Sequence, residues 1–238
     1  MTLGLYVHIP FCRHKCLYCD FPSYAGLERY RDGYVRALCR DIAASPYAGE
    51  EADTIYIGGG TPSLLAAGEI GRILETLRRT FRIADDAEIT MEANPDSLSY
   101  DKAAALADCG VNRLSLGVQS FSDAMLSFLG RVHTAAQGER AIQAAYDAGI
   151  HNLSLDLMYG LPGQTLADVR RDVERLSQLP VVHASIYSLI VEEGTQLKAG
   201  LEKGDWQLPP DEATEAMART VHDAMHGYGF HHYEISSY

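Results

Sequence analysis

The sequence predicts an α/β protein in which a parallel sheet forms an open, partial (β/α)6 barrel. Short apolar or β-branched runs alternate with longer segments of helical period, and the alternation repeats six times. Strands that alternate with helices in this way pair in parallel through right-handed crossovers. Because six units are too few to close an eightfold barrel, we expect the sheet to stay partly open.

The expected elements follow one another along the first 190 residues. The strands are expected at residues 5–9, 54–58, 88–93, 113–118, 152–159 and 183–189. The helices are expected near residues 26–45, 63–80, 100–108, 123–129, 134–148 and 166–178. Gly149 and Pro180 lie just past two of these helices, where helix-terminating residues belong.

The pattern changes after residue 194, which we expect to be the end of the barrel core, residues 1–194. The segment that begins at residue 195 is rich in turn residues, and a helix is expected at about 211–227. The last residues, "HHYEISSY", are typical of a further strand. Because the chain stops on this strand, we expect residues 195–238 to be the start of a truncated C-terminal α+β region.

The charge balance argues against a nucleic-acid partner. Twenty Lys and Arg residues against 32 Asp and Glu residues give a net charge of −12, without a basic footprint for phosphates. The sequence has no run of 18 apolar residues, and its N-terminus lacks the basic and apolar regions of a signal peptide. We therefore expect a cytoplasmic protein without a transmembrane segment.

Three of the five cysteines lie within eight positions, directly after the first expected strand. Cys12, Cys16 and Cys19 form a C-x3-C-x2-C pattern, which in a reducing compartment indicates metal binding more than disulfides. A loop of this length can place three thiolates on one face of a four-iron cluster, each on one iron. The fourth iron then stays open and can chelate the amino and carboxylate groups of S-adenosylmethionine.

A structural zinc site is the alternative that the spacing leaves open. Zinc needs four ligands and would have to recruit His14 or the distant Cys39. His14 lies between two of the cysteines, where it would crowd the loop. Cys39 and Cys109 are expected to be small buried hydrophobic residues. Five of the other histidines are expected at the surface or at helix caps, namely His133, His151, His183, His222 and His226.

Polar residues follow several expected strands, at the ends where barrels of this kind collect functional groups. Residues 58–62, "GGGTP", include three residues without a Cβ, so a ligand can approach their backbone; a simple tight turn is the alternative. Glu92, Gln119 and Asp156 lie at or near the ends of the next three strands. Because polar groups are costly to bury without partners, we expect them to face a polar ligand.

The cysteine loop, with the aromatic Tyr18 before its last cysteine, resembles that of the radical S-adenosylmethionine (radical SAM) superfamily. The longer segment "LYVHIPFCRHKCLYCDF" is similar to the branch that contains oxygen-independent coproporphyrinogen III oxidases and heme chaperones of the HemW type. The resemblance continues along essentially the whole chain, through "IYIGGGTPSLL", "ITMEANPDSL", "GVNRLSLGVQSF", "LGRVH", "NLSLDLMYGLPGQT", "YSLIVEEGT" and "HHYEISSY". It implies a partial barrel of the radical SAM type.

The resemblance also implies which residues bind the cofactors. Cys12, Cys16 and Cys19 would hold a [4Fe-4S] cluster. The positions that would contact S-adenosylmethionine are Tyr6, Tyr18, Gly59, Gly60, Thr61, Glu92, Gln119, Arg131 and Asp156. As alternatives, Arg131 is a solvated cation at a helix end and Tyr6 is an ordinary strand aromatic.

One position separates the two types of protein in this branch. The oxidases carry a further cysteine two positions after the third ligand, where this chain has Phe21. The resemblance therefore favours a chaperone that binds heme and passes it to heme-accepting proteins, with an electron donor for the cluster. The family's heme-linked H-N-x-x-Y-W motif would lie after residue 238. A coproporphyrinogen-decarboxylating enzyme and a zinc-stabilised, non-enzymatic binding protein are the alternatives.

Overall fold

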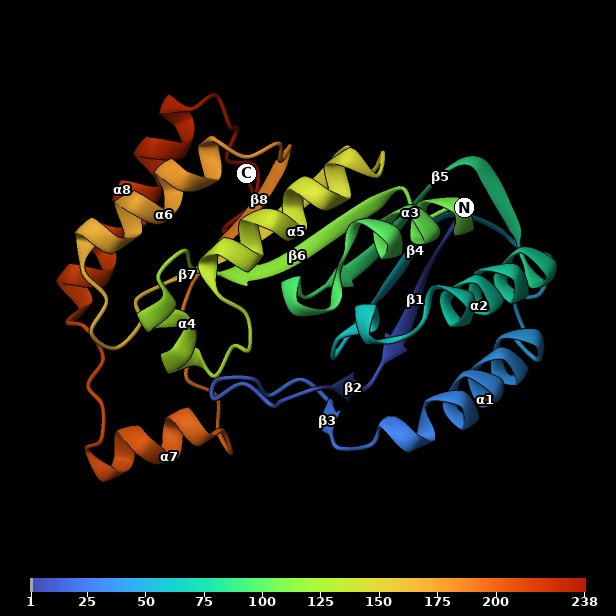
Figure 1. Ribbon diagram of the computed structural model, residues 1–238, viewed down its shortest axis with the longest axis horizontal. Coiled ribbons are helices and arrows are strands. Elements are labelled where there is room, and N and C mark those ends of the chain that lie inside the picture. The colour runs from blue at the N-terminus through green and yellow to red at the C-terminus, as the bar shows by residue number, and fades with distance from the viewer. Residues whose placement is uncertain (1) are drawn as a thin grey trace.

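The computed structural model describes residues 2–238 and contains a six-stranded sheet in the order β1-β4-β5-β6-β7-β8 (Figure 1). Every neighbouring pair in this order is parallel, so each connection between successive strands of this sheet is a crossover. The predicted parallel α/β fold with six strands is therefore confirmed. The strands are β1 (Leu3–Ile9), β4 (Glu51–Gly59), β5 (Arg82–Ala93), β6 (Arg113–Gln119), β7 (Asn152–Tyr159) and β8 (His183–Ser188).

The α-helices lie between successive strands and after the last one. They are α1 (Arg31–Ala43), α2 (Ala67–Thr80), α3 (Tyr100–Cys109), α4 (Asp123–Leu129), α5 (Ala135–Asp147), α6 (Leu166–Ser177), α7 (Gln196–Lys203) and α8 (Asp211–Gly227). Neighbouring helices in the series α1, α2, α3 and α5 pack on one another, and α6 packs on α8. Short 3₁₀ turns at Glu28–Tyr30, Pro62–Leu64 and Pro95–Ser97 precede α1, α2 and α3, so the first two helices begin later than expected.

Strand β6 shows how the sequence separates the two faces of the sheet. Successive side chains of a strand point to opposite faces. Leu114, Leu116 and Val118 are fully buried in the main hydrophobic core, where each contributes about 1.5 to 3 kcal/mol through burial. The intervening Ser115 and Gly117 belong to the opposite, polar face, and both line a cavity there. The alternation thus places chemistry on one face and packing on the other.

The segment that begins at residue 195 is expected to be rich in turns, but it contains helix α7, which the sequence analysis did not predict. Thr195 caps this helix, since its Oγ1 accepts a hydrogen bond from the Lys198 backbone N–H at 3.2 Å. Gly204 ends it in the left-handed conformation, with φ 81°. Leu197 is fully buried, and its N–H donates to the Leu17 carbonyl at 2.9 Å, so the first turn of the helix lies against the cysteine loop.

The expected strand at residues 231–238 is wrong as a continuous element. Only isolated antiparallel bridges occur there, in which Ser237 pairs with β8 and with Glu234. Tyr238 and Ala184 exchange two backbone hydrogen bonds, of 2.9 and 3.0 Å, which hold the tail along β8. The tail folds back on itself at Glu234, where the Ser237 N–H donates to the Glu234 carbonyl, and this turn interrupts a regular strand.

Helix α8 joins the C-terminal region to the barrel. It packs on α6, β7 and β8, and Met217, Val221 and Met225 enter the main hydrophobic core.

The domain boundary between residues 194 and 195 stays a prediction. Within residues 2–238, none of the helices combines the length and apolar character that crossing a membrane requires.

Candidate functional site

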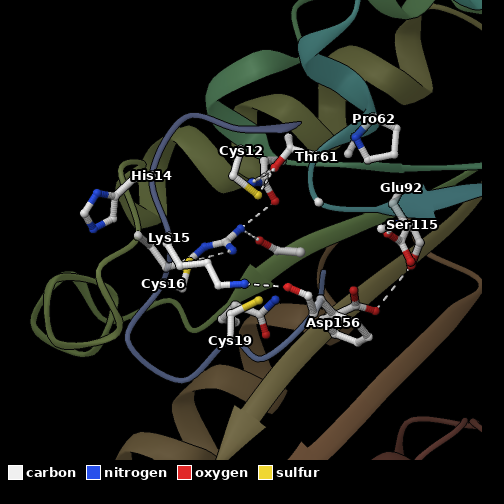
Figure 2. A pocket seen from close by; sticks show the side chains of 18 of the residues that line it. Cys12, His14, Lys15, Cys16, Cys19, Thr61, Pro62, Glu92, Ser115 and Asp156 are labelled. Carbon is white, nitrogen blue, oxygen red and sulfur yellow. Dashed lines mark hydrogen bonds between the residues drawn. The ribbon is translucent and has the colours of Figure 1, made fainter. Parts of the chain in front are cut away.

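A cavity lies where the strands end, and eleven of the twelve predicted site residues line it. Figure 2 shows the three cysteines on one side of this cavity and Glu92 and Asp156 on the other. The carboxyl ends of parallel strands meet at one edge of a sheet, which brings these distant residues together. The predicted residues in the cavity are Cys12, Cys16, Tyr18, Cys19, Gly59, Gly60, Thr61, Glu92, Gln119, Arg131 and Asp156.

The cysteine loop, residues 12–19, begins at the end of the short strand β2 (Phe11–Cys12), which pairs with β3 (Tyr24–Ala25). This pairing ties the two ends of the loop together. In the middle of the loop, the Leu17 N–H donates to the Leu129 carbonyl at 3.1 Å, and the Leu17 carbonyl accepts from the Leu197 N–H at 2.9 Å. The ends of α4 and α7 therefore fix the loop over the sheet.

Two of the three cysteine sulfurs receive side-chain hydrogen bonds. Arg131 Nη1 donates to Cys16 Sγ at 3.6 Å, and Thr61 Oγ1 donates to Cys12 Sγ at 3.7 Å. Burial raises the pKa of the Cys16 thiol, and the neighbouring Arg131 charge opposes that rise. Arg131 is thus placed inside the cavity, and the alternative of a solvated helix-end cation does not describe it.

The glycine segment gives the loop room to approach the sheet. Gly59 has φ 117°, a left-handed conformation in which a Cβ would lie 2.6 Å from the His8 ring. A Cβ on Gly60 would lie 2.7 Å from the Phe11 carbonyl oxygen and 3.0 Å from Cys12 Sγ. Close packing thus requires glycine at both positions, against His8 of β1 for Gly59 and against the start of the cysteine loop for Gly60. Contact of this segment with a ligand stays a prediction.

Glu92 forms part of the opposite wall of the cavity. Its carboxylate accepts hydrogen bonds from Tyr56 Oη at 2.8 Å and from the Gly59 N–H at 2.9 Å. Burial raises the pKa of Glu92, while these two hydrogen bonds act in the opposite direction. The carboxylate is thus oriented before any ligand arrives.

Asp156 lies on the same wall, and its only side-chain hydrogen bond in the described structure comes from Ser115 Oγ at 3.3 Å. Burial, and then the neighbouring Glu92 charge, raise the pKa of Asp156 to about 7. Its acceptor capacity is thus poorly satisfied by the protein itself. A ligand that donates hydrogen bonds would supply what the fold leaves out.

The raised pKa of Asp156 predicts a pH-dependent cost to folding of the cluster-free chain. The native state keeps the Asp156 proton up to about pH 7, whereas the unfolded chain releases it near pH 4. Because the native state binds the extra proton, stability falls as pH rises through this window. Asparagine has no such proton to release, so Asp156→Asn removes this loss. The free energy of unfolding in urea, taken as variant minus unaltered chain, should therefore rise by about 2 kcal/mol from pH 5 to pH 8. An equal gain in the exposed control Asp85→Asn would contradict this cause.

Gln119 reaches the cavity through an uncommon backbone conformation, with φ 73°. Its side-chain Oε1 accepts a hydrogen bond from Tyr187 Oη at 3.0 Å. The next two residues are held by the buried Asp172 of α6, whose carboxylate accepts from Ser120 Oγ at 2.7 Å and from the Phe121 N–H at 2.8 Å. Helix α6 therefore helps to hold the strained turn that presents Gln119.

Tyr6 is the one predicted residue that does not line the cavity. Its side chain is 60% exposed, and its hydroxyl lies 3.1 Å from His8 Nδ1. Its ring stacks on Tyr56, with 6.1 Å between the ring centroids. Contact between Tyr6 and a cofactor stays a prediction, and its present contacts are those of a strand aromatic.

The cavity also contains residues that the sequence analysis did not single out as ligand contacts, namely His14, Lys15, Phe21, Pro62, Ala93, Asn94, Ser115, Gly117 and Tyr187. Ser115 and Gly117 pair across the sheet with Glu92 and Asp156, so the period-two alternation of β6 could have identified them. Asn94 directly follows β5 and offered the same strand-end signal.

The expectation for His133 is wrong. This residue is buried, with only 3% of its surface exposed, and does not lie at the surface.

The residues of the cavity fit the iron–sulfur cluster that the cysteine spacing implies. Three thiols line one part of its wall, two of them receive hydrogen bonds, and the lack of a Cβ on Gly60 lets the glycine segment lie close to Cys12 Sγ. Among residues 2–238, no three His, Cys, Asp or Glu side chains form a group arranged to hold a metal ion. Cys39 and Cys109 are half-buried and do not line the cavity.

A family model for the radical SAM superfamily matches residues 6–176 of the chain. The chain belongs to the radical SAM superfamily. The matched range contains the cysteine loop and every predicted contact from Tyr6 to Asp156. Membership implies a [4Fe-4S] cluster and S-adenosylmethionine as cofactors, in agreement with the resemblance seen in the sequence.

Similar proteins place this radical SAM chain in the branch that the sequence indicated. The heme chaperone HemW of Bacillus subtilis strain 168 is 40% identical over 236 residues, or 98% of this chain and 62% of the relative. The heme chaperone HemW of Escherichia coli K12 is 41% identical over 239 residues, or 99% of this chain and 62% of the relative. The chain thus spans about three fifths of the length of these curated relatives.

A solved structure supports the same branch. The coproporphyrinogen III oxidase HemN of Escherichia coli, described as a radical SAM enzyme, matches with a TM-score of 0.90 and 27% sequence identity. The match covers 99% of this chain and 55% of that chain. The fold of the radical SAM partial barrel is therefore shared over nearly all of the present sequence.

Proposed function

We propose that the full-length protein is a radical SAM heme chaperone, which binds heme and transfers it to heme-accepting proteins. The observation that carries this proposal is 40 and 41% identity, over nearly the whole chain, to proteins named heme chaperone HemW. Phe21 gives further support, because it lines the cavity at the position where the oxidase pattern has an additional cysteine. Because the chain spans about three fifths of these relatives, heme binding is assigned to the full-length protein.

The cavity is proposed as the site of both radical SAM cofactors. Cys12, Cys16 and Cys19 hold the cluster, and the glycine segment admits the zwitterionic end of S-adenosylmethionine. The Glu92 and Arg131 side chains offer opposite charges for its amino and carboxylate groups, while Gln119 and Asp156 accept or donate hydrogen bonds to the rest. When bound, the cluster supplies the electron that can cleave the sulfonium of S-adenosylmethionine.

The proposed setting is the cytoplasm, because an iron–sulfur protein with five free cysteines needs a reducing compartment. An electron donor for the cluster and heme-accepting proteins are the proposed partners. The net charge of −12 argues against a nucleic-acid partner.

Oxidative decarboxylation of coproporphyrinogen is the second candidate function. It is favoured by the likeness to HemN, whose TM-score is 0.90. Both candidates use the same cofactor site, so the geometry of the cavity does not distinguish them. The distinction lies in what the full-length protein does with a tetrapyrrole.

The two candidates predict opposite results in two assays on the full-length, reconstituted protein. Titration with heme should give a saturable change in the heme absorbance spectrum, and an added apo-heme protein should then acquire the heme. Supplied anaerobically with coproporphyrinogen, S-adenosylmethionine and a reductant, the protein should form no protoporphyrinogen. Turnover at about 1 s⁻¹ or faster, within the usual range for enzymes, would overturn the chaperone proposal in favour of the oxidase.

A further inference from the structure

We propose that Asn94 is a positioning residue for Arg131 and Thr61, the two side chains that donate hydrogen bonds to sulfurs of the cysteine loop. By holding them in place, Asn94 raises the reduction potential of the cluster. The inference rests on the proposed cluster site, and it goes beyond the heme-chaperone proposal. Asn94 follows β5 directly and lines the cavity between the glycine segment and Arg131. It contacts the cluster ligands only through other residues.

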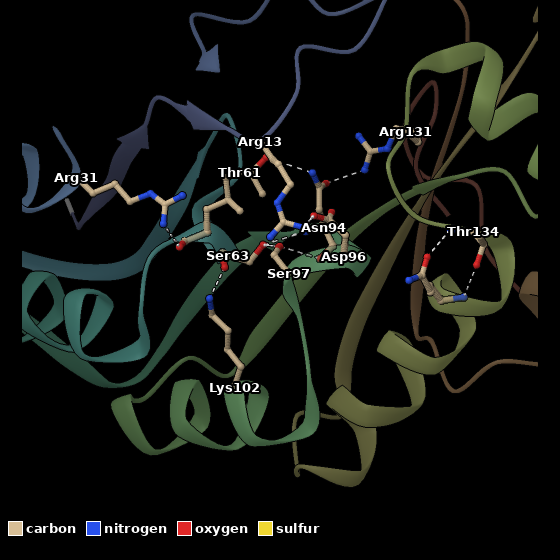
Figure 3. A network of polar contacts seen from close by, with 12 residues as sticks. Arg13, Arg31, Thr61, Ser63, Asn94, Asp96, Ser97, Lys102, Arg131 and Thr134 are labelled. Atoms are coloured by element: carbon tan, nitrogen blue, oxygen red, sulfur yellow. Dashed lines mark hydrogen bonds and ion pairs between the residues drawn. The ribbon is translucent and has the colours of Figure 1, made fainter. Parts of the chain in front are cut away.

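The amide of Asn94 bridges the two donors, as Figure 3 shows. Arg131 Nη2 donates to Asn94 Oδ1 at 2.7 Å, and Asn94 Nδ2 donates to Thr61 Oγ1 at 3.2 Å. Because Arg131 can only donate, this contact fixes which end of the amide faces it. Arg131 in turn donates to Cys16 Sγ, and Thr61 donates to Cys12 Sγ. One side chain thus connects two of the three proposed ligands.

The backbone around Asn94 is itself fixed. The Asn94 N–H donates to Ser63 Oγ at 3.0 Å, and the Asn94 carbonyl accepts from Ser97 Oγ at 3.0 Å. The two serine hydroxyls lie 2.6 Å apart and so complete a closed network. A Cβ on Gly117 would lie 3.3 Å from Asn94 Oδ1, so the absence of that atom gives the amide and Arg131 room to meet. The position of the amide is therefore determined by the fold.

Hydrogen bonds to cluster sulfurs are among the factors that set the potential of an iron–sulfur centre. Reduction adds negative charge to a cluster that already carries anionic thiolates, so donors stabilise the reduced form more than the oxidised form. Loss of Asn94 removes one of the two acceptors of Arg131 Nη2, the other being the Gly117 carbonyl, and it removes the donor to Thr61 Oγ1. Both side chains then have more freedom to turn away from the sulfurs. The potential should then fall, although every cluster ligand is still present.

The experiment compares Asn94→Leu with Asn112→Leu in the full-length protein, reconstituted anaerobically. Leucine has a similar size but can form neither hydrogen bond. Asn112 is the matched control because its amide also bridges β5, donating to the Ala87 carbonyl and accepting from the Ile89 N–H, both at 2.8 Å. Redox titration followed by electron paramagnetic resonance should show a lower potential for Asn94→Leu and an unchanged potential for Asn112→Leu.

A double variant tests whether Asn94 acts through Thr61. Thr61→Val removes the hydroxyl donor and keeps the shape of the side chain. As a single change, it should therefore lower the potential of the cluster. Combined with Asn94→Leu, it should lower the potential by less than the sum of the two single shifts, because the two changes share one path. Additive shifts would overturn the part of the proposal that runs through Thr61.

The remaining outcomes also decide the proposal. An unchanged potential in Asn94→Leu with full iron content would overturn it. If Asn94→Leu does not retain a cluster, Asn94→Ser, which is too short to reach both partners, supplies the measurement, and an unchanged potential there overturns the proposal equally. Failure of the unaltered protein to assemble a four-iron cluster would overturn the cluster site itself, which separates the two failures.

Discussion

Replacing any one of Cys12, Cys16 and Cys19 with Ala is expected to abolish the visible absorbance of the reconstituted cluster. Each thiolate is proposed to hold one iron, and a site with two thiolates leaves two irons without a protein ligand. The other two cysteines, Cys39 and Cys109, do not line the cavity, so neither is placed to replace a lost ligand. Iron and sulfide content measures the loss directly.

Cys39→Ala and Cys109→Ala are the matched controls, since each also removes one thiol. Cys39 lies on α1 with its Sγ 3.9 Å from the Arg72 carbonyl, and Cys109 lies at the end of α3 with its Sγ 3.6 Å from the Ala67 carbonyl. Neither lines the cavity, so both variants should keep the full iron content. Loss of the cluster in either control would show that the assignment of ligands is wrong.

Gln119→Ala and Asp156→Ala are expected to weaken S-adenosylmethionine binding about 10- to 100-fold while the cluster stays intact. Each removes a polar group that lines the cavity, and a hydrogen bond that involves a charged ligand or side chain contributes about 1.5 to 3 kcal/mol. Equilibrium dialysis on the reconstituted, oxidised protein measures the affinity separately from turnover.

Gln143→Ala is the control for these two variants. Gln143 lies on α5, where its amide donates only to Asp147 on the surface at 2.8 Å. Its replacement should leave the affinity for S-adenosylmethionine unchanged. Equal affinity in the unaltered protein and in both cavity variants would remove Gln119 and Asp156 from the binding site.

Features carried by local pattern could be predicted from the sequence. The parallel strands follow from their apolar runs, and the cysteine spacing marked one wall of the cavity. Glu92 and Asp156 were identifiable because a carboxylate in an apolar strand is conspicuous. Helix α7 was missed although Thr195 and Gly204 carry cap signals, since eight residues give too few turns for an apolar period to be recognised.

Features that depend on contacts across the fold could not be predicted. Asp172 supports the turn after Gln119 by accepting a hydrogen bond from the Phe121 N–H, and these two residues are 51 positions apart in the sequence. His133 follows α4 and is buried with its ring Nε2 3.2 Å from the Val118 carbonyl, a contact that no local pattern indicates. Burial, and then the neighbouring Arg131 charge, lower the pKa of His133 to about 4. Such positions are set by tertiary packing.

The measurement that tests the central claim most directly is electron paramagnetic resonance of the reduced, reconstituted chain, with and without S-adenosylmethionine. Three protein thiolates on a four-iron cluster would leave one iron open, and Glu92, Gln119 and Asp156 line the same cavity as the three cysteines. We predict the signal of a reduced [4Fe-4S] cluster that changes on addition of S-adenosylmethionine, because the amino and carboxylate groups bind the open iron. A cluster signal that saturating S-adenosylmethionine leaves unchanged, or a chain that takes up zinc in place of iron, would contradict the account.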